Sequence, residues 1–238
     1  MKRRTLVIGS VLAVVGILAL LGARNFSRLN MLLNRVGIQP IATKTPAYYL
    51  CEDFGIEAVK SDVDYNGNGV DDYTDIVDGA RAEAQRKPKY HSAYYDGGYP
   101  PDDEGVCSDT VWRALKHAGY NLKDLIDADI VQNPDWYTDI EIPDPNIDFR
   151  RVKNLKVFFD HHYLNLAKDP YQIGEWMGGD LVIFGNSHIA VVSDRRNKEG
   201  IAYLIHNAAQ YNREEDALIA WDKKKGITGH YRFVRVLQ

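Results

Sequence analysis

The chain has 238 residues, of which 45% are hydrophobic and 26% charged, and its formal net charge is -4. A chain of this length and composition can bury a full core, which excludes a wholly disordered protein. Because its charge balance is weakly acidic rather than basic, we expect no nucleic-acid partner.

The N-terminus combines a basic cluster with a long apolar run. Residues 5–23 carry no charge and directly follow Lys2, Arg3 and Arg4. As a helix this run spans about 28 Å, close to the hydrocarbon core of a bilayer. The pattern predicts a cytoplasmic tail at 1–4 and a transmembrane anchor at 5–23, with the remaining chain outside the cytoplasm. A cleaved signal peptide, which would leave a secreted protein, is the competing interpretation.

Residues 24–48 have the pattern of a juxtamembrane connector. A helical stripe of apolar residues comes first, and an extended stretch bounded by Pro40 and Pro46 follows. We therefore expect one extracytoplasmic domain over residues 49–238.

The segment DYNGNGVDDYTD, residues 64–75, has the spacing of a calcium loop. Loops of the EF-hand type place oxygen ligands at positions 1, 3, 5, 7, 9 and 12 and a glycine at position 6. Counting from Asp64 puts Gly69 at position 6. The expected calcium ligands are Asp64, Asn66, Asn68, the carbonyl of Val70, Asp72 and Asp75.

This loop resembles the calcium repeats of dockerins and thrombospondin type 3 modules. A second register starting at Asp62 would place Tyr73 at position 12, so we reject it. The alternative is a surface turn that needs no metal, because Asx-rich sequences form turns unaided. We expect a structural calcium ion at the start of a helix that covers about residues 73–87.

Cys107 is one of only two cysteines and follows a loop rich in glycine and proline. A helix that begins near residue 107 would place the cysteine on its apolar face, together with Val111, Ala114, Leu115 and Ala118. Exposed N–H groups and the dipole at a helix start favour a thiolate. Asp109 in the first turn favours a helix start here. These features fit a buried core cysteine and a nucleophile equally well.

Strands carrying histidines follow downstream. Alternation and β-branched residues predict strands at 181–184 and 189–193, joined by a tight turn, with His188 at the start of the second. A third strand, at 201–209, carries His206 near its end. Two further strands are expected at 217–221 and 230–236. Helices first and an antiparallel sheet afterwards predict an α+β fold.

The same order is found in papain-like cysteine hydrolases, including the small NlpC-type cell-wall peptidases. The blocks GVCSDTVWRAL, DPNIDFRRVKNLKVFF, GDLVIF with HIAVVSDRR, LIHNAA and ITGHYRF together resemble bacterial uncharacterised-domain family number 1287, which is grouped with those enzymes. The resemblance covers about residues 76–238. It implies a papain-like (NlpC-type) fold with Cys107 as nucleophile, His188 as base and His206 as the residue that orients His188.

The chemistry agrees with this assignment, because sulfur attacks a carbonyl as thiolate and needs an imidazole to take its proton. Asn207 and Asp194 are the other candidates for orienting His188, since strand alternation sends His206 and Asn207 to opposite faces. We expect the Cys107 backbone N–H and a second donor, Tyr95 or Tyr99, to bind the oxyanion.

Three alternatives remain from the sequence. Cys51 can pair with Cys107 in an oxidising exterior, which would abolish nucleophilic chemistry. Cys107, His188 and His206 are also suitable zinc ligands. Finally, the domain can be a non-catalytic binding module of the cell envelope.

We predict a membrane-anchored thiol hydrolase that cleaves amide bonds without a cofactor for its chemistry. The export signal and the NlpC-like resemblance together make peptidoglycan stem peptides the leading substrate.

Overall fold

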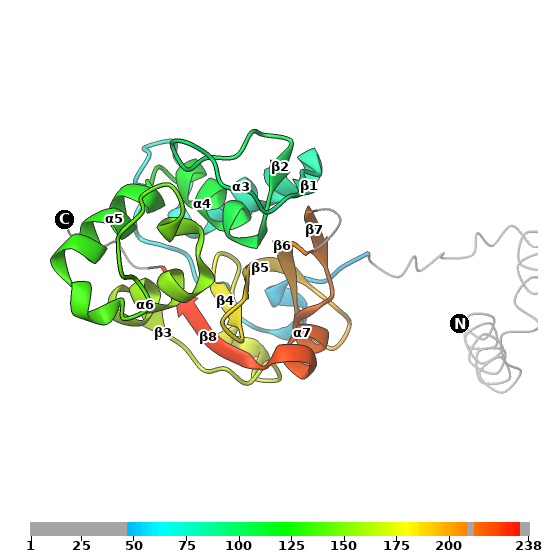
Figure 1. Cartoon of the computed structure of the whole chain (residues 1–238). Coiled ribbons are helices and arrows are strands. Elements are labelled where there is room, and N and C mark those ends of the chain that lie inside the picture. Colours follow the sequence, from blue (N-terminus) through cyan, green and yellow to red (C-terminus); the bar gives the residue numbers. More distant parts are fainter. Residues whose placement is uncertain (1–46, 209–211, 234–238) are drawn as a thin grey trace, which may run out of the picture. The chain divides into compact units, whose positions relative to one another are not determined.

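A computed structural model describes residues 47–208 and 212–233 (Figure 1). The helices are α3 (Asp72–Arg86), α4 (Cys107–His117), α5 (Leu122–Gln132), α6 (Val152–His162) and α7 (Leu218–Lys225). The strands are β1 (Lys89–Tyr90), β2 (Glu104–Gly105), β3 (Leu164–Asn165), β4 (Leu181–Phe184), β5 (His188–Arg196), β6 (Ala202–Asn207), β7 (Asn212–Glu215) and β8 (Ile227–Arg232). The predicted α+β class is confirmed.

Six of the strands form one antiparallel sheet in the order β3-β8-β4-β5-β6-β7. The turn after Phe184 makes a tight hairpin in which Phe184 pairs with His188. Strands 181–184 and 189–193 therefore form as predicted, and His188 is the first residue of β5. The short strands β1 and β2 pair in parallel, and β2 ends two residues before Cys107.

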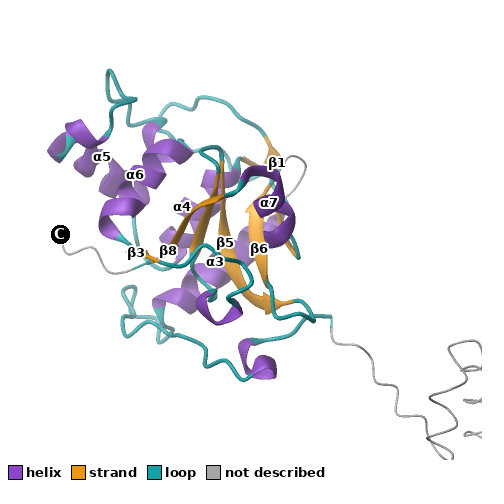
Figure 2. Ribbon diagram, turned by 90° about the horizontal axis from the view of Figure 1, so that it is seen from below, coloured by secondary structure: helices purple, strands orange, loops and turns teal. Residues whose placement is uncertain are grey.

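The sheet separates two hydrophobic clusters. One cluster packs α3, α4, α5 and α6 against the face that carries Ile189, Val191 and Ile205. The other lies on the opposite face, around Val192 and Leu204, and includes Leu218 of α7. Figure 1 shows α3 and α4 above the sheet and α7 below it, and Figure 2 gives the view from below. Residues that alternate along β5 and β6 therefore point either toward α4 or toward α7.

The segment 217–221 was expected to be a strand, but it lies in helix α7, so this prediction is wrong. Its run of alanine, leucine and isoleucine is short enough to suit either structure. Three lysines follow it, and alanine, leucine and lysine are all strong helix formers. Gly226 then ends the helix, with a left-handed φ of 74°.

At the chain ends, one prediction differs from the structure and others fall outside the described residues. The last strand covers Ile227–Arg232 instead of 230–236, and residues 234–238 lie outside the described part. The predicted tail at 1–4, the anchor at 5–23 and nearly all of the connector at 24–48 also lie outside it. Within residues 47–208 and 212–233, no helix is long and apolar enough to cross a bilayer.

Candidate active site

Cys107 is the first residue of α4, as the sequence predicts. Its partners on the predicted apolar face, from Val111 to Ala118, are buried with it. The Asp109 carboxylate caps the helix start, because its Oδ2 accepts a 2.7 Å hydrogen bond from the Val106 N–H. Asp109 therefore stabilises the helix start, and its charge also raises the pKa of the Cys107 thiol.

Asp109 is also clamped from the side by Arg150. The guanidinium donates from Nε to Oδ1 at 2.8 Å and from Nη2 to Oδ2 at 2.9 Å, and both side chains are buried. The indole N–H of Trp112 donates a third bond to the same carboxylate, at 2.8 Å. A bidentate pair of this kind fixes geometry as well as charge. The clamp ties the start of α4 to the segment that precedes α6.

The Cys107 side chain lies against β5. Burial raises the pKa of the Cys107 thiol, while the backbone N–H groups of Ile189 and Ser108 act in the opposite direction. The sulfur is thus beside the amide of Ile189, the residue that follows His188. In this structure no hydrogen bond joins the sulfur to the His188 ring, and such contacts often tighten only when substrate binds.

His188 and His206 are joined directly. His188 Nε2 and His206 Nδ1 are 2.7 Å apart, across the neighbouring strands β5 and β6. Both rings are buried on the face of the sheet opposite α4. The structure therefore brings together the predicted base and the residue predicted to orient it, and it assigns the orienting contact to His206.

Two residues that sequence reasoning missed complete this side of the site. Glu215 on β7 lies 3.1 Å from His206 Nε2 through its Oε1. The Trp221 ring of α7 stacks on His188, with ring centroids 3.9 Å apart and planes 13° apart. The sequence pattern did not indicate Trp221, because its segment reads as a strand. It did not indicate Glu215, because a short, charged strand has no hydrophobic alternation.

The surroundings of His188 disfavour its protonation. Burial is the main cause, followed by His206, Lys225 and Lys224, and together they lower the pKa of His188 to about 3. The imidazole is therefore neutral at physiological pH. A neutral ring has a lone pair that can accept a proton, and its low pKa makes the resting imidazole a weak base towards the cysteine.

Asn207 serves the other face of the sheet, as alternation predicts. Its amide donates to the Gly105 carbonyl at 3.1 Å and to the Pro88 carbonyl at 3.4 Å. Gly105 ends β2 and precedes Cys107 by two residues. Asn207 thus holds the segment that leads into the nucleophile and does not contact His188.

The other auxiliary candidates are engaged elsewhere. The Tyr95 hydroxyl donates to Glu104 at 2.9 Å, and the Tyr99 hydroxyl donates to Asn121 at 3.2 Å. Asp194 is half-exposed and forms an ion pair with Arg81, far along β5 from His188.

A different tyrosine lies near the sulfur. Burial and then the charges of Cys107 and Asp109 raise the pKa of Tyr90, which places its side chain in the electrostatic reach of the thiol. Tyr90 pairs with Gly105 in the β1–β2 ladder. It therefore replaces Tyr95 and Tyr99 as the candidate second donor to an oxyanion.

The two cysteines do not form a disulfide. Both are free and buried. The Cys51 sulfur accepts hydrogen bonds from Arg196, at 3.3 Å from Nε and 3.1 Å from Nη2. The structure therefore leaves Cys107 available as a thiol.

The zinc alternative finds no support in the geometry. His206 uses Nδ1 in its contact with His188 and Nε2 in its contact with Glu215, so neither of its nitrogens is free to share a metal with the sulfur. Among the described residues, no group of three or more His, Cys, Asp or Glu side chains could hold a metal ion.

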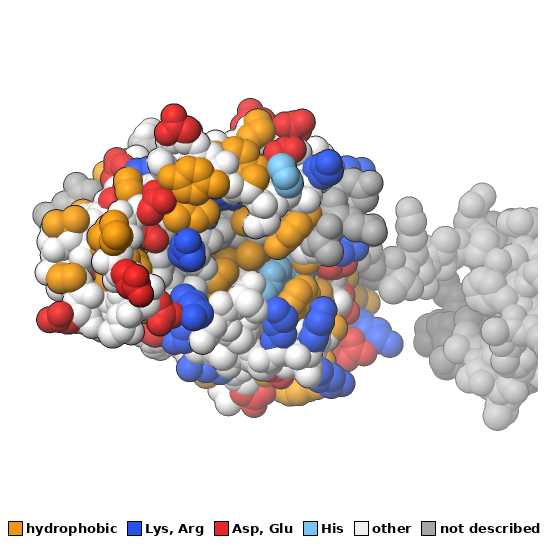
Figure 3. Space-filling view, viewed as in Figure 1, with side chains coloured by type: hydrophobic (Ala, Val, Ile, Leu, Met, Phe, Trp, Pro, Cys, Tyr) orange, Lys and Arg blue, Asp and Glu red, His pale blue; other side chains and the backbone are white. Residues whose placement is uncertain are grey.

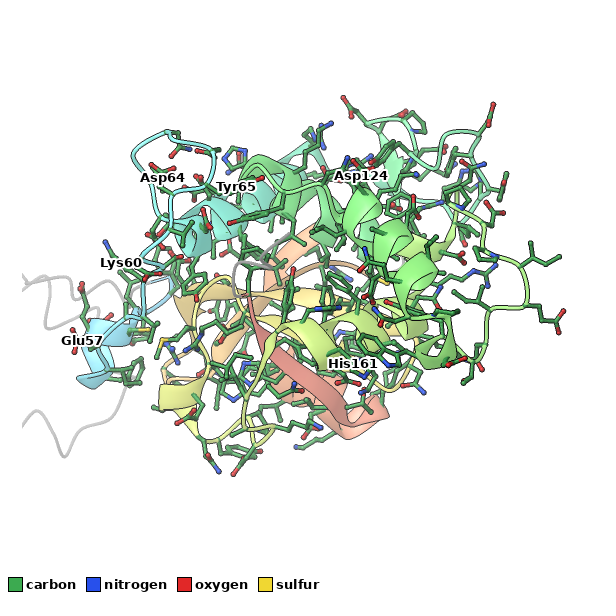
Figure 4. The ribbon with its side chains drawn as sticks, turned by 90° about the vertical axis from the view of Figure 1, so that its left-hand side faces the viewer. Glu57, Lys60, Asp64, Tyr65, Asp124 and His161 are labelled. Atoms are coloured by element: carbon green, nitrogen blue, oxygen red, sulfur yellow. The ribbon has the colours of Figure 1, made fainter. Side chains whose placement is uncertain are left out.

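The candidate calcium loop has the turn geometry that its glycines predict. Gly67 and Gly69 have φ values of 72° and 91° in the left-handed region. The Asp64 carboxylate accepts N–H bonds of 2.8 Å from both glycines. Figure 4 shows Asp64 on this peripheral loop beside α3.

The expected ligands converge only in part. The amides of Asn66 and Asn68 both contact the buried Asp75 carboxylate, at 2.7 Å and 3.0 Å. Asp72 instead accepts from the Tyr65 N–H at 2.8 Å and from the Tyr120 hydroxyl at 2.5 Å. The asparagine N–H groups, which cannot bind a cation, face Asp75, so the loop is a hydrogen-bonded turn here and calcium binding stays a prediction.

A cleft leads toward His188. It is a hollow of about 930 Å³ that is lined by Asn186, Ser187 and residues of the segment 138–154. Ser187 directly precedes His188. Figure 3 shows a histidine in a hollow among hydrophobic side chains, with lysine or arginine side chains below it.

Residues 77–233 match a family described as "Domain of unknown function (DUF1287)". The chain belongs to this family. The Uncharacterized protein YijF of Escherichia coli (strain K12) is 37% identical over 171 residues, which cover 66% of this chain and 80% of that protein. No solved structure matches the chain.

The DUF1287 match confirms the family that the sequence blocks predicted. It includes Cys107, His188, His206 and Glu215. The calcium loop at 64–75 and all residues before it lie outside the match. The grouping with papain-like enzymes, the anchor and the calcium ion stay predictions.

Proposed function

We propose that the protein is an extracytoplasmic thiol hydrolase of papain-like (NlpC-type) fold that cleaves amide bonds, with peptidoglycan stem peptides as its substrate. The observation that carries the proposal is the placement of Cys107 beside the amide of Ile189, the residue after His188, whose ring is neutral, stacked and hydrogen-bonded to His206. A nucleophile, a base and an orienting group are the parts that acyl transfer needs, and the base and its orienting group already lie at hydrogen-bond spacing.

The first half of the reaction forms a thioester. The Cys107 sulfur attacks the carbonyl carbon of the amide while its proton moves to His188. The C–N bond then breaks, the amine leaves with the proton from His188, and the acyl group stays on sulfur. The first N–H groups of α4 have no partner within the helix and can bind the oxyanion, with Tyr90 as a second donor.

The second half releases the product. Water attacks the thioester carbonyl and gives one proton to His188. The C–S bond breaks, the sulfur regains that proton, and the acyl group leaves as a carboxylic acid. Atoms and charges balance without a metal or a redox partner.

The location and substrate rest on the N-terminal sequence. A membrane anchor at 5–23 would hold the domain outside the cytoplasm, where peptidoglycan lies, and cleavage of this segment would release a secreted form. The cleft lined by Asn186, Ser187 and part of segment 138–154 has room for a peptide beside the base.

The test is incubation of the purified full-length chain with muropeptides, followed by mass spectrometry. We expect products that differ from the substrate by one water across an amide bond. Cys107→Ser should abolish them, and His206→Ala should lower turnover by up to about 10⁴-fold because it loses the orienting contact. Equal turnover by the Cys107→Ser variant would contradict the proposal, and stoichiometric zinc in the protein would favour the zinc alternative.

We further propose that Asp64, Asn66, Asn68, the Val70 carbonyl and Asp75 hold a structural calcium ion. The support is the ligand spacing of the sequence, the two left-handed glycines and the turn in which Asp64 accepts both glycine N–H groups. Oxygen ligands at this spacing suit calcium, and a site with few carboxylates suits the weak affinities of extracellular modules.

A further inference from the structure

The hydrogen-bond chain that starts at His188 does not end at His206 but continues to Glu215. We propose that Glu215 is a positioning residue that selects the tautomers of both histidines and so leaves His188 Nδ1 free as the base. This inference rests on the proposed function and adds a fourth residue to it.

Glu215 lies where it can act only through His206. On β7 it pairs with Leu204 of β6, and its side chain reaches the ring of His206 on the same face. The His206 hydrogen bond lowers the pKa of Glu215, against the opposing effect of partial burial. The carboxylate is therefore ionised at neutral pH, and an ionised carboxylate can only accept hydrogen bonds.

One proton position fixes the next along the chain. Because Glu215 only accepts, His206 Nε2 must carry the proton in their 3.1 Å contact. When His206 is neutral, its Nδ1 has a lone pair, so His188 Nε2 donates in the 2.7 Å contact. The neutral His188 has only one ring proton, which is now on Nε2. Its Nδ1 is left with a lone pair.

The opposite arrangement would disable the base. If His206 carried its proton on Nδ1, it would donate to His188 Nε2, and the single proton of His188 would move to Nδ1. In that state a lone pair of His206 Nε2 would face the Glu215 carboxylate, which is repulsive. Glu215 thus favours the tautomer in which His188 Nδ1 can take the proton. It does so through two successive hydrogen bonds, by way of His206.

A merely structural role for Glu215 predicts different behaviour. Its Oε1 also lies 3.4 Å from Arg213 Nε, so the carboxylate could serve only to pair with Arg213 on the same strand. In that case Arg213→Gln should reproduce the effects of changing Glu215. Under our proposal Arg213→Gln leaves the tautomers unchanged, which makes it a matched control.

The choice of substitution separates the two roles further. Glu215→Gln preserves shape but introduces an amide that can donate to His206 Nε2, which stabilises the unproductive tautomer. Glu215→Ala removes the acceptor without adding a donor. We therefore expect the isosteric glutamine to be more harmful than alanine, whereas a structural role predicts the reverse.

The first measurement is nitrogen-15 NMR of the histidine rings in the full-length protein at neutral pH. We expect protonated Nε2 and bare Nδ1 on both His188 and His206, with Arg213→Gln giving the same result. Glu215→Gln should move population to protonated Nδ1. Unchanged tautomers in Glu215→Gln, or the same change in Arg213→Gln, would overturn the proposal.

The second measurement is the rate of Cys107 alkylation by iodoacetamide as a function of pH. We expect Glu215→Gln to lower the rate at neutral pH by about tenfold or more, since wrong tautomers cost up to about 10⁴-fold in a triad where the carboxylate contacts the base directly. Glu215→Ala should lower it less, and Arg213→Gln should not lower it. A larger loss in Glu215→Ala than in Glu215→Gln would contradict the assignment.

Both readouts are independent of substrate. If muropeptides are not cleaved but the tautomers respond to Glu215→Gln, the proposed substrate fails and the positioning role stands. If muropeptides are cleaved and the tautomers do not respond, the positioning role fails alone.

Discussion

Cys107 and His188 are both uncharged at rest, for the same physical reason. Burial disfavours the charged form of each group, so it raises the pKa of the thiol and lowers that of the imidazole. A preformed ion pair is therefore not the ground state. Under the proposed mechanism, the thiol gives its proton to the His188 lone pair as attack begins.

Alkylation by iodoacetamide tests the nucleophile. At neutral pH we expect Cys107 to react much faster than Cys51, because only Cys107 lies at the start of an α-helix, whose N–H groups and dipole favour a thiolate. His188→Ala should slow the reaction, and His117→Ala, a half-exposed position at the far end of the same helix, should not. Peptide mass spectrometry measures both rates. Equal labelling of the cysteines, or protection of Cys107 until a reductant is added, would contradict the assignment.

The depressed pKa of His188 also predicts how stability depends on pH. Between its unfolded pKa of about 6.5 and its folded pKa of about 3, only the unfolded chain carries this proton. Above pH 6.5 this protonation takes nothing from the free energy of unfolding. As the pH falls through this window, the free energy of unfolding decreases. From pH 7 to pH 5 the loss is about 2 kcal/mol.

Urea unfolding of the wild type and His188→Gln at both pH values measures this loss. The variant should lose about 2 kcal/mol less than the wild type on acidification. A His117→Gln variant should follow the wild type. Parallel pH dependences of the wild type and His188→Gln would show that the folded protein protonates His188 as readily as the unfolded chain.

At the scale of elements, the sequence located those with a clear period. The apolar stripe and Asp109 marked the start of α4, and alternation marked β4, β5 and β6. Cys107, His188 and His206 were found for this reason. The short apolar run of α7 fits a helix and a strand equally well, and β7 has no apolar alternation. The places of Trp221 and Glu215 beside the histidines are therefore seen only in the folded structure.

Helix α7 also places two positively charged lysines near His188. The ammonium groups of Lys224 and Lys225 lie 4.9 Å and 5.8 Å from the Trp221 ring centroid, and both lower the pKa of His188. We therefore expect Cys107 to favour anionic reagents. The ratio of its alkylation rates with iodoacetate and iodoacetamide should exceed that of a free thiol.

Substitution of these lysines tests this effect. Lys224→Gln and Lys225→Gln should each lower the ratio about twofold, since a charge about 8 Å away in water contributes about 0.5 kcal/mol. High salt should reduce the difference. Lys198→Gln, on the distant β5–β6 turn, is the control. A ratio that stays constant in all three variants would show that the lysines do not act on the thiol.

At the scale of the whole domain, the calcium loop lies against the end of α4 opposite Cys107. The Asn66 amide donates to the His117 carbonyl at 3.0 Å, and Tyr65 stacks on Tyr120 with ring centroids 4.3 Å apart. An ion in this loop would therefore stabilise the helix that carries the nucleophile from its far end.

Thermal unfolding with calcium and with chelator tests this site. A ligand at a hundredfold excess over its dissociation constant stabilises the folded state by about 2.7 kcal/mol, so chelation should lower the melting temperature. Asp64→Ala should remove the calcium dependence, while Asp62→Ala, from the rejected register, should keep it. Identical melting curves with calcium and with chelator would mean that the loop is a turn without a metal.

The neighbouring residues His206 and Asn207 of β6 together fix the position of His188 relative to the segment that leads to Cys107. One side chain holds the ring of His188, and the other holds the backbone that leads to Cys107. Inserting one residue into β6 before them would exchange their faces, so the hydrogen bonds of both side chains would be lost together. Length variation in this protein should therefore be tolerated after Asn207, at the β6–β7 connection, but not within the strand.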